Sequence, residues 1–190
     1  MRVIETSDLK EALDILGMEE EIALIGVHKR PLLCTGRIDS SDLHVARALG
    51  YDIATVEHLG GTIICSPGDI SFAANVFGDP VGTENRFLDA MLAYLSNFSS
   101  DVVRSENDIL LDGKKVTSAA GARRNNGFGV FYAHCSVNTN LDMIRRLCTK
   151  KMVKVPGRLA DYDVPIEELK KVFLRNVLNE KEVLNGYLLH

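Results

Sequence analysis

The sequence predicts an α+β domain, in which a mostly antiparallel mixed sheet is flanked by helices. Two observations predict this class: short apolar runs bounded by Gly or Pro are interspersed with stripes of helical period, and an Asp112-Gly113 pair joins two β-runs. Of the 190 residues, 46% are hydrophobic and 25% charged, which is enough apolar material for one core without disulfides or metals. We expect one domain over residues 1–190, with residues 155–190 as a helical C-terminal part and no accessory C-terminal domain.

The N-terminal half is expected to alternate between helices and strands. Ser7-Asp8 caps a first helix that Gly17 ends, and a second helix begins within Asp39-Ser40-Ser41-Asp42 and ends at Gly50. Apolar runs bounded by glycine or proline predict strands at residues 22–27, 32–36, 52–56, 62–65 and 70–76.

The C-terminal half adds a long helix, a hairpin and further helices. Phe87, Met91 and Tyr94 recur with helical period and predict a helix over residues 83–98. Asn140 caps a helix over residues 141–148, and Pro165 precedes another over residues 166–178. The remaining expected elements are the hairpin strands 108–111 and 114–120, a strand over residues 127–137 and a last helix over residues 181–189.

The Asp112-Gly113 turn fixes the expected register of the hairpin, because a two-residue turn pairs the flanking residues directly. Leu111 is then opposite Lys114, Leu110 opposite Lys115, Ile109 opposite Val116 and Asp108 opposite Thr117. Alternation places Lys115 on the polar face with Asp108 and Thr117, and places Leu111, Ile109 and Val116 on the core face. The simplest alternative is a surface hairpin with two solvated lysines.

Composition excludes several classes of function. The net charge of −4 argues against a nucleic-acid partner, and the cluster Lys150, Lys151 and Lys154 is interpreted as a solvated helix end. No apolar run reaches the roughly 18 residues of a membrane span, and no signal peptide is evident, so we expect a cytoplasmic protein with no membrane partner. Its four cysteines show no C-x-x-C pair or His/Cys ligand spacing, so no metal site is predicted. His28 and His44 are expected at the surface.

Residues 105–120, SENDILLDGKKVTSAA, resemble the signature of the lipoate–protein ligase and octanoyltransferase family, also described as biotin/lipoate cofactor transferases. Similarity extends from about residue 20 to residue 178. Residues 57–69 stand where the family has Arg-Arg-x-Ser-Gly-Gly-Gly, and residues 131–141 stand where it has a His-His-Gly-Thr strand. The resemblance implies a class II synthetase-like cofactor transferase domain that moves lipoate or octanoate onto a lysine of a lipoyl-carrier domain protein. A ligase would use ATP and Mg²⁺, and a separate accessory domain is a further expected partner.

The resemblance also implies a set of site residues. The family's catalytic lysine falls on Lys115, and Cys65 is a second catalytic candidate because octanoyltransferases use a cysteine nucleophile beside the lysine. The alternative for Cys65 is a small buried hydrophobe. His134 and Cys135 are neighbours in one strand, so they point to opposite faces and form no dyad. The expected cofactor-binding residues are His58, Gly60, Gly61, Thr62, Asp108, Thr117, Ala119, Ala133 and His134.

The sequence departs from the family pattern at the glycine loop. Glu57-His58 replaces Arg-Arg, which removes two cations and adds an acid that repels a nucleotide. Gly60-Gly61 is followed by Thr62 in place of a third glycine. Two other functions therefore stay open: a biotin-type ligase, and a non-catalytic relative that keeps the fold as a ligand- or protein-binding module.

Overall fold

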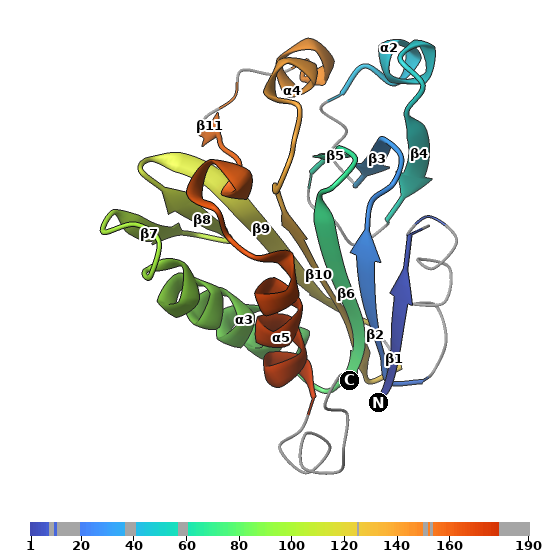
Figure 1. The fold of residues 1–190 in the computed structure, drawn as a ribbon. Coiled ribbons are helices and arrows are strands. Elements are labelled where there is room, and N and C mark those ends of the chain that lie inside the picture. The colour runs from blue at the N-terminus through green and yellow to red at the C-terminus, as the bar shows by residue number, and fades with distance from the viewer. Residues whose placement is uncertain are drawn as a thin grey trace.

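A large mixed sheet forms the centre of the molecule (Figure 1). The computed structural model describes residues 1–7, 10, 20–36, 41–56, 61–124, 126–149, 152 and 154–178. The main sheet has the order β1-β2-β6-β10-β9-β8-β7, and β11 pairs with β9 beside this path. Its strands are β1 (Arg2–Thr6), β2 (Ile22–Val27), β6 (Ile70–Phe77), β7 (Val102–Ser105), β8 (Asp108–Leu111), β9 (Lys114–Arg123), β10 (Phe128–Cys135) and β11 (Val155–Pro156). Within the main sheet, all pairings are antiparallel except β1 with β2 and β11 with β9. This mostly antiparallel sheet confirms the expected α+β class.

A second, smaller sheet lies beside one end of the main sheet (Figure 1). Its strands β3 (Leu32–Thr35), β4 (Asp52–Thr55) and β5 (Ile63–Cys65) have the order β4-β3-β5. Helices α2 (Leu43–Ala48) and α4 (Leu141–Leu147) pack on it through a small apolar cluster that includes Leu33, Ala46 and Leu147. The other side of this sheet packs on the main sheet, where Cys34 and Cys65 meet Ala73, Val130 and Tyr132.

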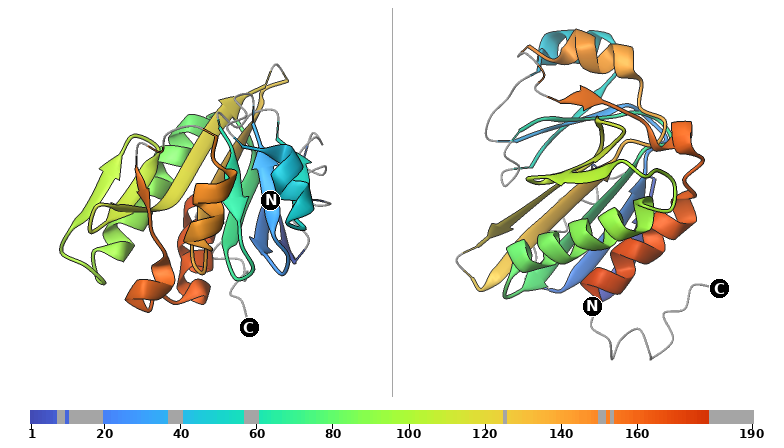
Figure 2. Two further views of the ribbon diagram at one scale, coloured as in Figure 1. Left: turned by 90° about the horizontal axis from the view of Figure 1, so that it is seen from above. Right: turned by 90° about the vertical axis from the view of Figure 1, so that its left-hand side faces the viewer.

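Two helices cover one face of the main sheet. Helix α3 (Pro80–Leu95) and helix α5 (Ile166–Val177) lie side by side against it (Figure 2), and a short 3₁₀ turn, η2 (Leu159–Tyr162), precedes α5. Four aromatic rings fill the space between: Phe72 stacks on Phe173 at 4.7 Å between centroids, and Phe87 meets Phe131 at 5.3 Å. All four side chains are fully buried, so this layer is the main hydrophobic core.

The helix boundaries follow the local signals in the sequence. Asp42 caps α2 by accepting a hydrogen bond from the Val45 amide, and Asn140 caps α4 as expected. Helix α3 begins three residues earlier than expected, at Pro80, because proline suits the first helical position and needs no N–H partner. The helix predicted at residues 7–17 falls mostly outside the described residues, and that at residues 181–189 falls wholly outside them.

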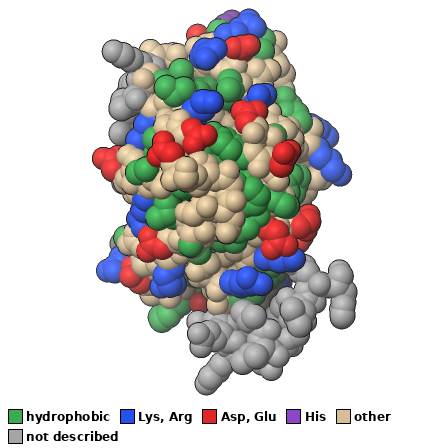
Figure 3. Space-filling model, turned by 60° about the vertical axis from the view of Figure 1, so that its left-hand side comes forward, with side chains coloured by type: hydrophobic (Ala, Val, Ile, Leu, Met, Phe, Trp, Pro, Cys, Tyr) green, Lys and Arg blue, Asp and Glu red, His purple; other side chains and the backbone are tan. Residues whose placement is uncertain are grey.

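The surface carries charges of both signs. On the face drawn in Figure 3, acidic and basic side chains are interspersed rather than gathered by sign. Among the described helices, none is long and apolar enough to cross a membrane.

Candidate functional site

The hairpin β8–β9 has the predicted turn but a different inner register. Leu111 pairs with Lys114 and Leu110 with Lys115, as expected. A β-bulge between Ile109 and Leu110 then shifts the pairing, so that Ile109 is opposite Thr117 and Asp108 opposite Ser118. The two predicted inner pairs, with Val116 and Thr117, were therefore wrong, because Val116 is an extra residue that a strictly alternating strand lacks.

The bulge brings Lys115 and Ser118 to the same carboxylate. Lys115 Nζ lies 3.0 Å from Asp108 Oδ1, and the Ser118 hydroxyl donates to the same oxygen at 2.8 Å. In a regular strand, residues three apart point to opposite faces. The predicted proximity of Lys115 and Asp108 is thus observed, with Ser118 in the place expected for Thr117.

A second lysine reaches this carboxylate from a distant part of the chain. Lys154, just before β11, places its Nζ 2.7 Å from Asp108 Oδ2 and donates to the Ser105 carbonyl at 2.9 Å. Burial alone would raise the pKa of Asp108, but the Lys115 charge and the hydrogen bonds from both lysines and Ser118 lower that pKa overall. The carboxylate is therefore charged at neutral pH and holds two ammonium groups.

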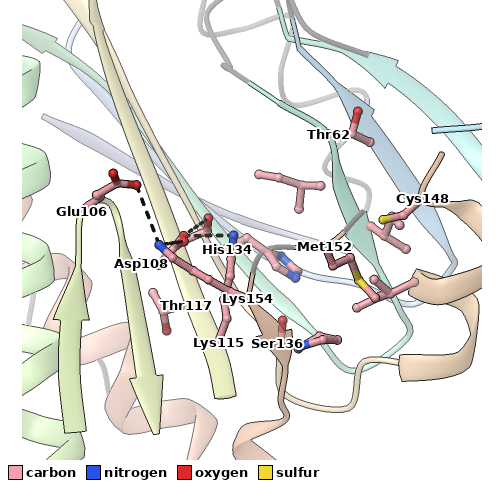
Figure 4. A pocket seen from close by; sticks show the side chains of 15 residues that line it. Thr62, Glu106, Asp108, Lys115, Thr117, His134, Ser136, Cys148, Met152 and Lys154 are labelled. Carbon is pink, nitrogen blue, oxygen red and sulfur yellow. Dashed lines mark hydrogen bonds and ion pairs between the residues drawn. The ribbon is translucent and has the colours of Figure 1, made fainter. Parts of the chain in front are cut away.

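These groups form one side of a cavity of about 440 Å³. Figure 4 shows Asp108, Lys115 and Lys154 together on one side, with Cys148 and Met152 on the other. Ile63, Ile64 and Ile144 add apolar surface to the lining. A cavity that joins an apolar wall to fixed charges suits an amphiphilic ligand with a polar reacting end.

The structure brings only some of the predicted site residues to this cavity. Those that line it are Thr62, Asp108, Lys115, Thr117 and His134. Ala119 and Ala133 are paired across β9 and β10 and are buried outside the lining, while Gly61 is exposed. His58 and Gly60 lie outside the described residues.

Cys65 is fully buried in β5 and does not line the cavity. Burial raises the pKa of its thiol well above the usual value, and a hydrogen bond with Cys34 raises it further. A neutral thiol without access to the cavity does not suit a nucleophile. The cysteine that the cavity exposes is instead Cys148, which is half-buried at the end of α4 and lines the cavity.

His134 belongs to a buried polar network behind the cavity. Its Nδ1 lies 3.0 Å from the Ser71 hydroxyl and 3.7 Å from the Cys65 sulfur. His28 also contacts the Ser71 hydroxyl, through Nε2 at 2.9 Å, and is only 4% exposed. The expectation that His28 is a surface residue was therefore wrong, because its backbone is hydrogen-bonded to Gly68 and Asp69 and its ring contacts the buried Ser71. His44 is exposed as expected.

Sequence reasoning missed Lys154, Ser118 and Cys148. Lys154 stands in a basic run that is typical of a solvated helix end, and only the parallel pairing of β11 with β9 carries it to the hairpin. The bulge that selects Ser118 has no glycine or proline to mark it. For Cys148, the one signal in the sequence is its position at the end of the helix predicted over residues 141–148.

Comparison with known proteins gives one family. The lipoyl protein ligase A/B catalytic domain matches residues 10–177. No curated protein sequence matches the chain.

Several solved structures share the fold. A bi-partite lipoate protein ligase from Thermoplasma acidophilum, studied with its E2 lipoyl domain, is 20% identical with a TM-score of 0.71, over 97% of this chain and 83% of that one. Lipoate-protein ligase A bound with ATP is 21% identical with a TM-score of 0.72, over 97% and 85%. Biotin protein ligase from Aquifex aeolicus, with biotin and ATP, is less similar, at 12% identity and a TM-score of 0.54 over 98% and 71%.

Proposed function

Because the chain belongs to the lipoyl protein ligase A/B catalytic domain family, we propose that it transfers a lipoyl or octanoyl group onto a lysine of a lipoyl-carrier domain. The observation that carries the proposal is the position of Lys115. Its side chain lines the cavity, and its Nζ lies 3.0 Å from Asp108 Oδ1. The T. acidophilum ligase was studied with an E2 lipoyl domain and is bi-partite. By analogy, we propose a lipoyl domain as acceptor and a separate accessory domain as a second partner.

Lys115 is the proposed catalytic residue. Its ammonium group has three donors, and the Asp108 carboxylate, itself held by the Ser118 hydroxyl, fixes its position without enclosing it, since the Lys115 side chain is 37% exposed. The remaining N–H groups are available to the carbonyl oxygen of the acyl group. They would stabilise the negative charge that develops there when the acceptor amine attacks.

The apolar wall is proposed to hold the acyl chain. Ile63 and Ile64 in β5 and Ile144 in α4 line the cavity together with Met152. Methionine adapts its shape to a flexible chain and its sulfur is polarisable. Both octanoate and the dithiolane-bearing lipoate present the apolar surface that such a wall accepts.

The ATP-dependent route is the first candidate for activating the acyl group. Lys154 supplies a second ammonium group beside Lys115, and together they offer positive charge to a phosphate, although the sequence has Glu57 where the family has arginine. The two acidic side chains of the described lining do not suit Mg²⁺, because both Asp108 oxygens face lysine ammonium groups and Glu106 Oε2 lies 3.9 Å from Lys154 Nζ. We therefore assign no step to the metal.

A thiol route is the second candidate, favoured by Cys148. Of the four cysteines, all within described segments, only Cys148 lines the cavity. Burial raises the pKa of its thiol, while the Lys115 charge acts in the opposite direction. In this route the Cys148 sulfur attacks an octanoyl thioester and releases the donor thiol, and the acceptor lysine amine then takes the acyl group and frees the cysteine.

The test is the mass of a lipoyl domain after incubation with the protein and either lipoate plus ATP or an octanoyl thioester. Wild-type protein should add one acyl group, and Lys115→Ala should slow transfer by about 10²–10³-fold. The matched control is Lys114→Ala, which removes the exposed neighbouring lysine and should leave the rate unchanged.

Each outcome decides a part of the proposal. Transfer by Lys115→Ala at the wild-type rate contradicts the role of Lys115, and no transfer by the wild type from either donor contradicts the function. Loss of thioester-dependent transfer in Cys148→Ala, with ATP-dependent transfer intact, assigns the thiol route. Transfer of biotin alone, to a biotinyl acceptor, would instead identify a biotin-type ligase.

A further inference from the structure

Three potential metal ligands converge in the buried layer behind the cavity. His28 follows β2, Cys65 ends β5 and His134 lies in β10, and one ligand atom of each lies within 4.8 Å of the others. All three side chains are buried, with exposed fractions of 4%, 0% and 5%. The spacing of these residues in the sequence does not indicate a metal site, because each ligand comes from a different strand or strand end.

The Ser71 hydroxyl marks the point on which the two imidazole rings converge. His28 Nε2 lies 2.9 Å from this oxygen and His134 Nδ1 lies 3.0 Å from it. The Cys65 sulfur lies 3.7 Å from the same His134 nitrogen. Two ring nitrogens and a thiol that face one point have the donor set of N/S metal sites, in which metal–ligand bonds are about 2.0–2.3 Å long.

The chemistry of the donors suits a soft or borderline ion. Burial, together with the neighbouring His134, lowers the pKa of His28 to about 4, and burial with the Lys115 charge lowers the pKa of His134 to about 3. Both rings are therefore neutral at pH 7 and carry a lone pair. The Cys65 thiol keeps its proton in the absence of metal, and an ion that binds there displaces it as thiolate forms.

Asp69 is in position to orient His134. Its Oδ2 lies 3.7 Å from His134 Nε2, a buried atom that has no hydrogen-bond partner. The carboxylate is itself held by the amides of Val137 and Asn138 and by the Thr139 hydroxyl. If Nδ1 binds a metal, Nε2 carries the proton and faces Asp69, which is the carboxylate–histidine–metal arrangement of known sites.

Cys34 is hydrogen-bonded to Cys65 but lies outside the group of three whose ligand atoms are all within 4.8 Å of one another. Its thiol forms a hydrogen bond with Cys65 that lowers the pKa of Cys34, and its sulfur lies 3.8 Å from the Tyr132 hydroxyl. Two neutral histidines with one thiolate leave a divalent ion with a net positive charge in an apolar layer. A second thiolate from Cys34 neutralises that charge, which removes the cost of burying it.

We propose that His28, Cys65 and His134, with Cys34 as the fourth ligand, form a binding site for a thiophilic divalent metal ion, for which Zn²⁺ is the probe. Binding requires the Cys34 thiol to move towards the centre and the Ser71 hydroxyl, which also accepts a hydrogen bond from the Tyr132 hydroxyl at 3.1 Å, to turn away from it. Cys34 and Cys65 belong to the small sheet, whereas His134 belongs to the main sheet and His28 directly follows its strand β2. The ion would therefore tie the two sheets together directly behind the cavity wall.

The experiment uses full-length protein, stripped with a chelator under reducing conditions and titrated with Co²⁺ and then Zn²⁺. We expect a thiolate-to-cobalt charge-transfer band that saturates at one ion per chain and disappears as Zn²⁺ replaces Co²⁺. Cys65→Ser should lose at least half of the band's intensity, because Cys34 is then the one thiolate left in the proposed site. The control Cys135→Ser removes a thiol that is equally buried but bonded to Thr117, and should keep it.

A second measurement does not depend on the ligand variants folding normally. Zn²⁺ should raise the Tm of stripped wild-type protein, since an ion that binds only the folded state stabilises it. Asp69→Asn should weaken Zn²⁺ binding by about 10–100-fold, as expected for a residue that orients a ligand. Absence of Co²⁺ or Zn²⁺ uptake by reduced wild-type protein, or equal loss in Cys135→Ser and Cys65→Ser, would overturn the proposal.

Discussion

Lys154 and Asp108, 46 residues apart in sequence, meet at 2.7 Å between Nζ and Oδ2. This contact joins the segment before β11 to the hairpin, while Lys115 occupies the other oxygen of the same carboxylate. Asp108 thus bridges two cations that would otherwise repel each other at one side of the cavity. The position of Lys115 depends on this bridge as much as on the hairpin.

Asp108→Asn should therefore impair both stability and transfer. The amide has nearly the same shape but no charge, so the two ammonium groups lose their shared partner. We expect the free energy of unfolding to fall by about 1.5–3 kcal/mol, the range for hydrogen bonds to charged groups, and acyl transfer to fall in parallel with Lys115→Ala. Urea denaturation and the lipoyl-domain mass assay measure the two effects.

Asp112→Asn is the control for this substitution. Asp112 lies in the turn with φ of 47°, a conformation that asparagine also adopts readily, and its carboxylate is far less buried than that of Asp108. The Asp112→Asn variant should transfer the acyl group at the wild-type rate. Equal behaviour of the two variants would argue against the bridging role of Asp108.

Stability should fall as the pH is lowered from 7 towards 5. The pKa of His28 is lowered from 6.5 to about 4 in the folded protein. Between these values the unfolded chain binds a proton that the folded chain does not, so the free energy of unfolding rises with pH. His28→Gln removes this contribution and should reduce the slope, measured by urea denaturation with chelator present. His134, whose pKa is lowered to about 3, keeps a contribution of the same sign in all variants.

His44→Gln, at an exposed position, should keep the wild-type slope. Asp69 acts in the opposite direction, because burial raises its pKa, but it is present in all three proteins and cancels in the comparison. A slope in His28→Gln as steep as in the wild type would mean that His28 titrates equally in the folded and unfolded states.

Gly121→Ala should destabilise the contact between α3 and the sheet. A Cβ at this position would lie 2.7 Å from the Pro80 carbonyl oxygen, which is backbone and cannot rotate away. The first turn of α3 must then lift from β9, so we expect a loss of about 1–3 kcal/mol, as for overpacked cores. Gly61→Ala is the matched control, because a Cβ there meets nothing within 4 Å. Thermal unfolding of the pair measures the difference, and equal Tm values would contradict the close packing.

Much of the fold was predictable because its signals are local. The Asp112-Gly113 turn and the caps at Asp42 and Asn140 each act within a few residues, and the structure has them as expected. β1 was not predicted, because Arg2–Thr6 mixes charged and apolar residues in an edge strand. Its pairing with β2 is parallel, so no tight hairpin turn between the two strands marks it in the sequence.

The site was less predictable because its groups meet through tertiary contacts. Lys115 and Asp108 were paired correctly, since one hairpin carries both. From the sequence, Lys154 is predicted to be solvated and His28 to be at the surface, because a charged or titratable residue gives no sign in the sequence of the partner that buries it. The same limit applies to the His28, Cys65 and His134 cluster, whose members are distant along the chain.

The bulge at Val116 has a consequence for how this hairpin can change length during evolution. Deleting that one residue would restore regular alternation and still leave Ser118 opposite Asp108, because residues two apart share a face, but it would remove the buried Val116 side chain from the core. An insertion at the Asp112-Gly113 turn, by contrast, would lengthen an exposed tip and preserve the pairing below it. We therefore expect related chains to vary in length at the tip and, where they lack the bulge residue, to keep the residues equivalent to Lys115 and Ser118 on one face of the strand.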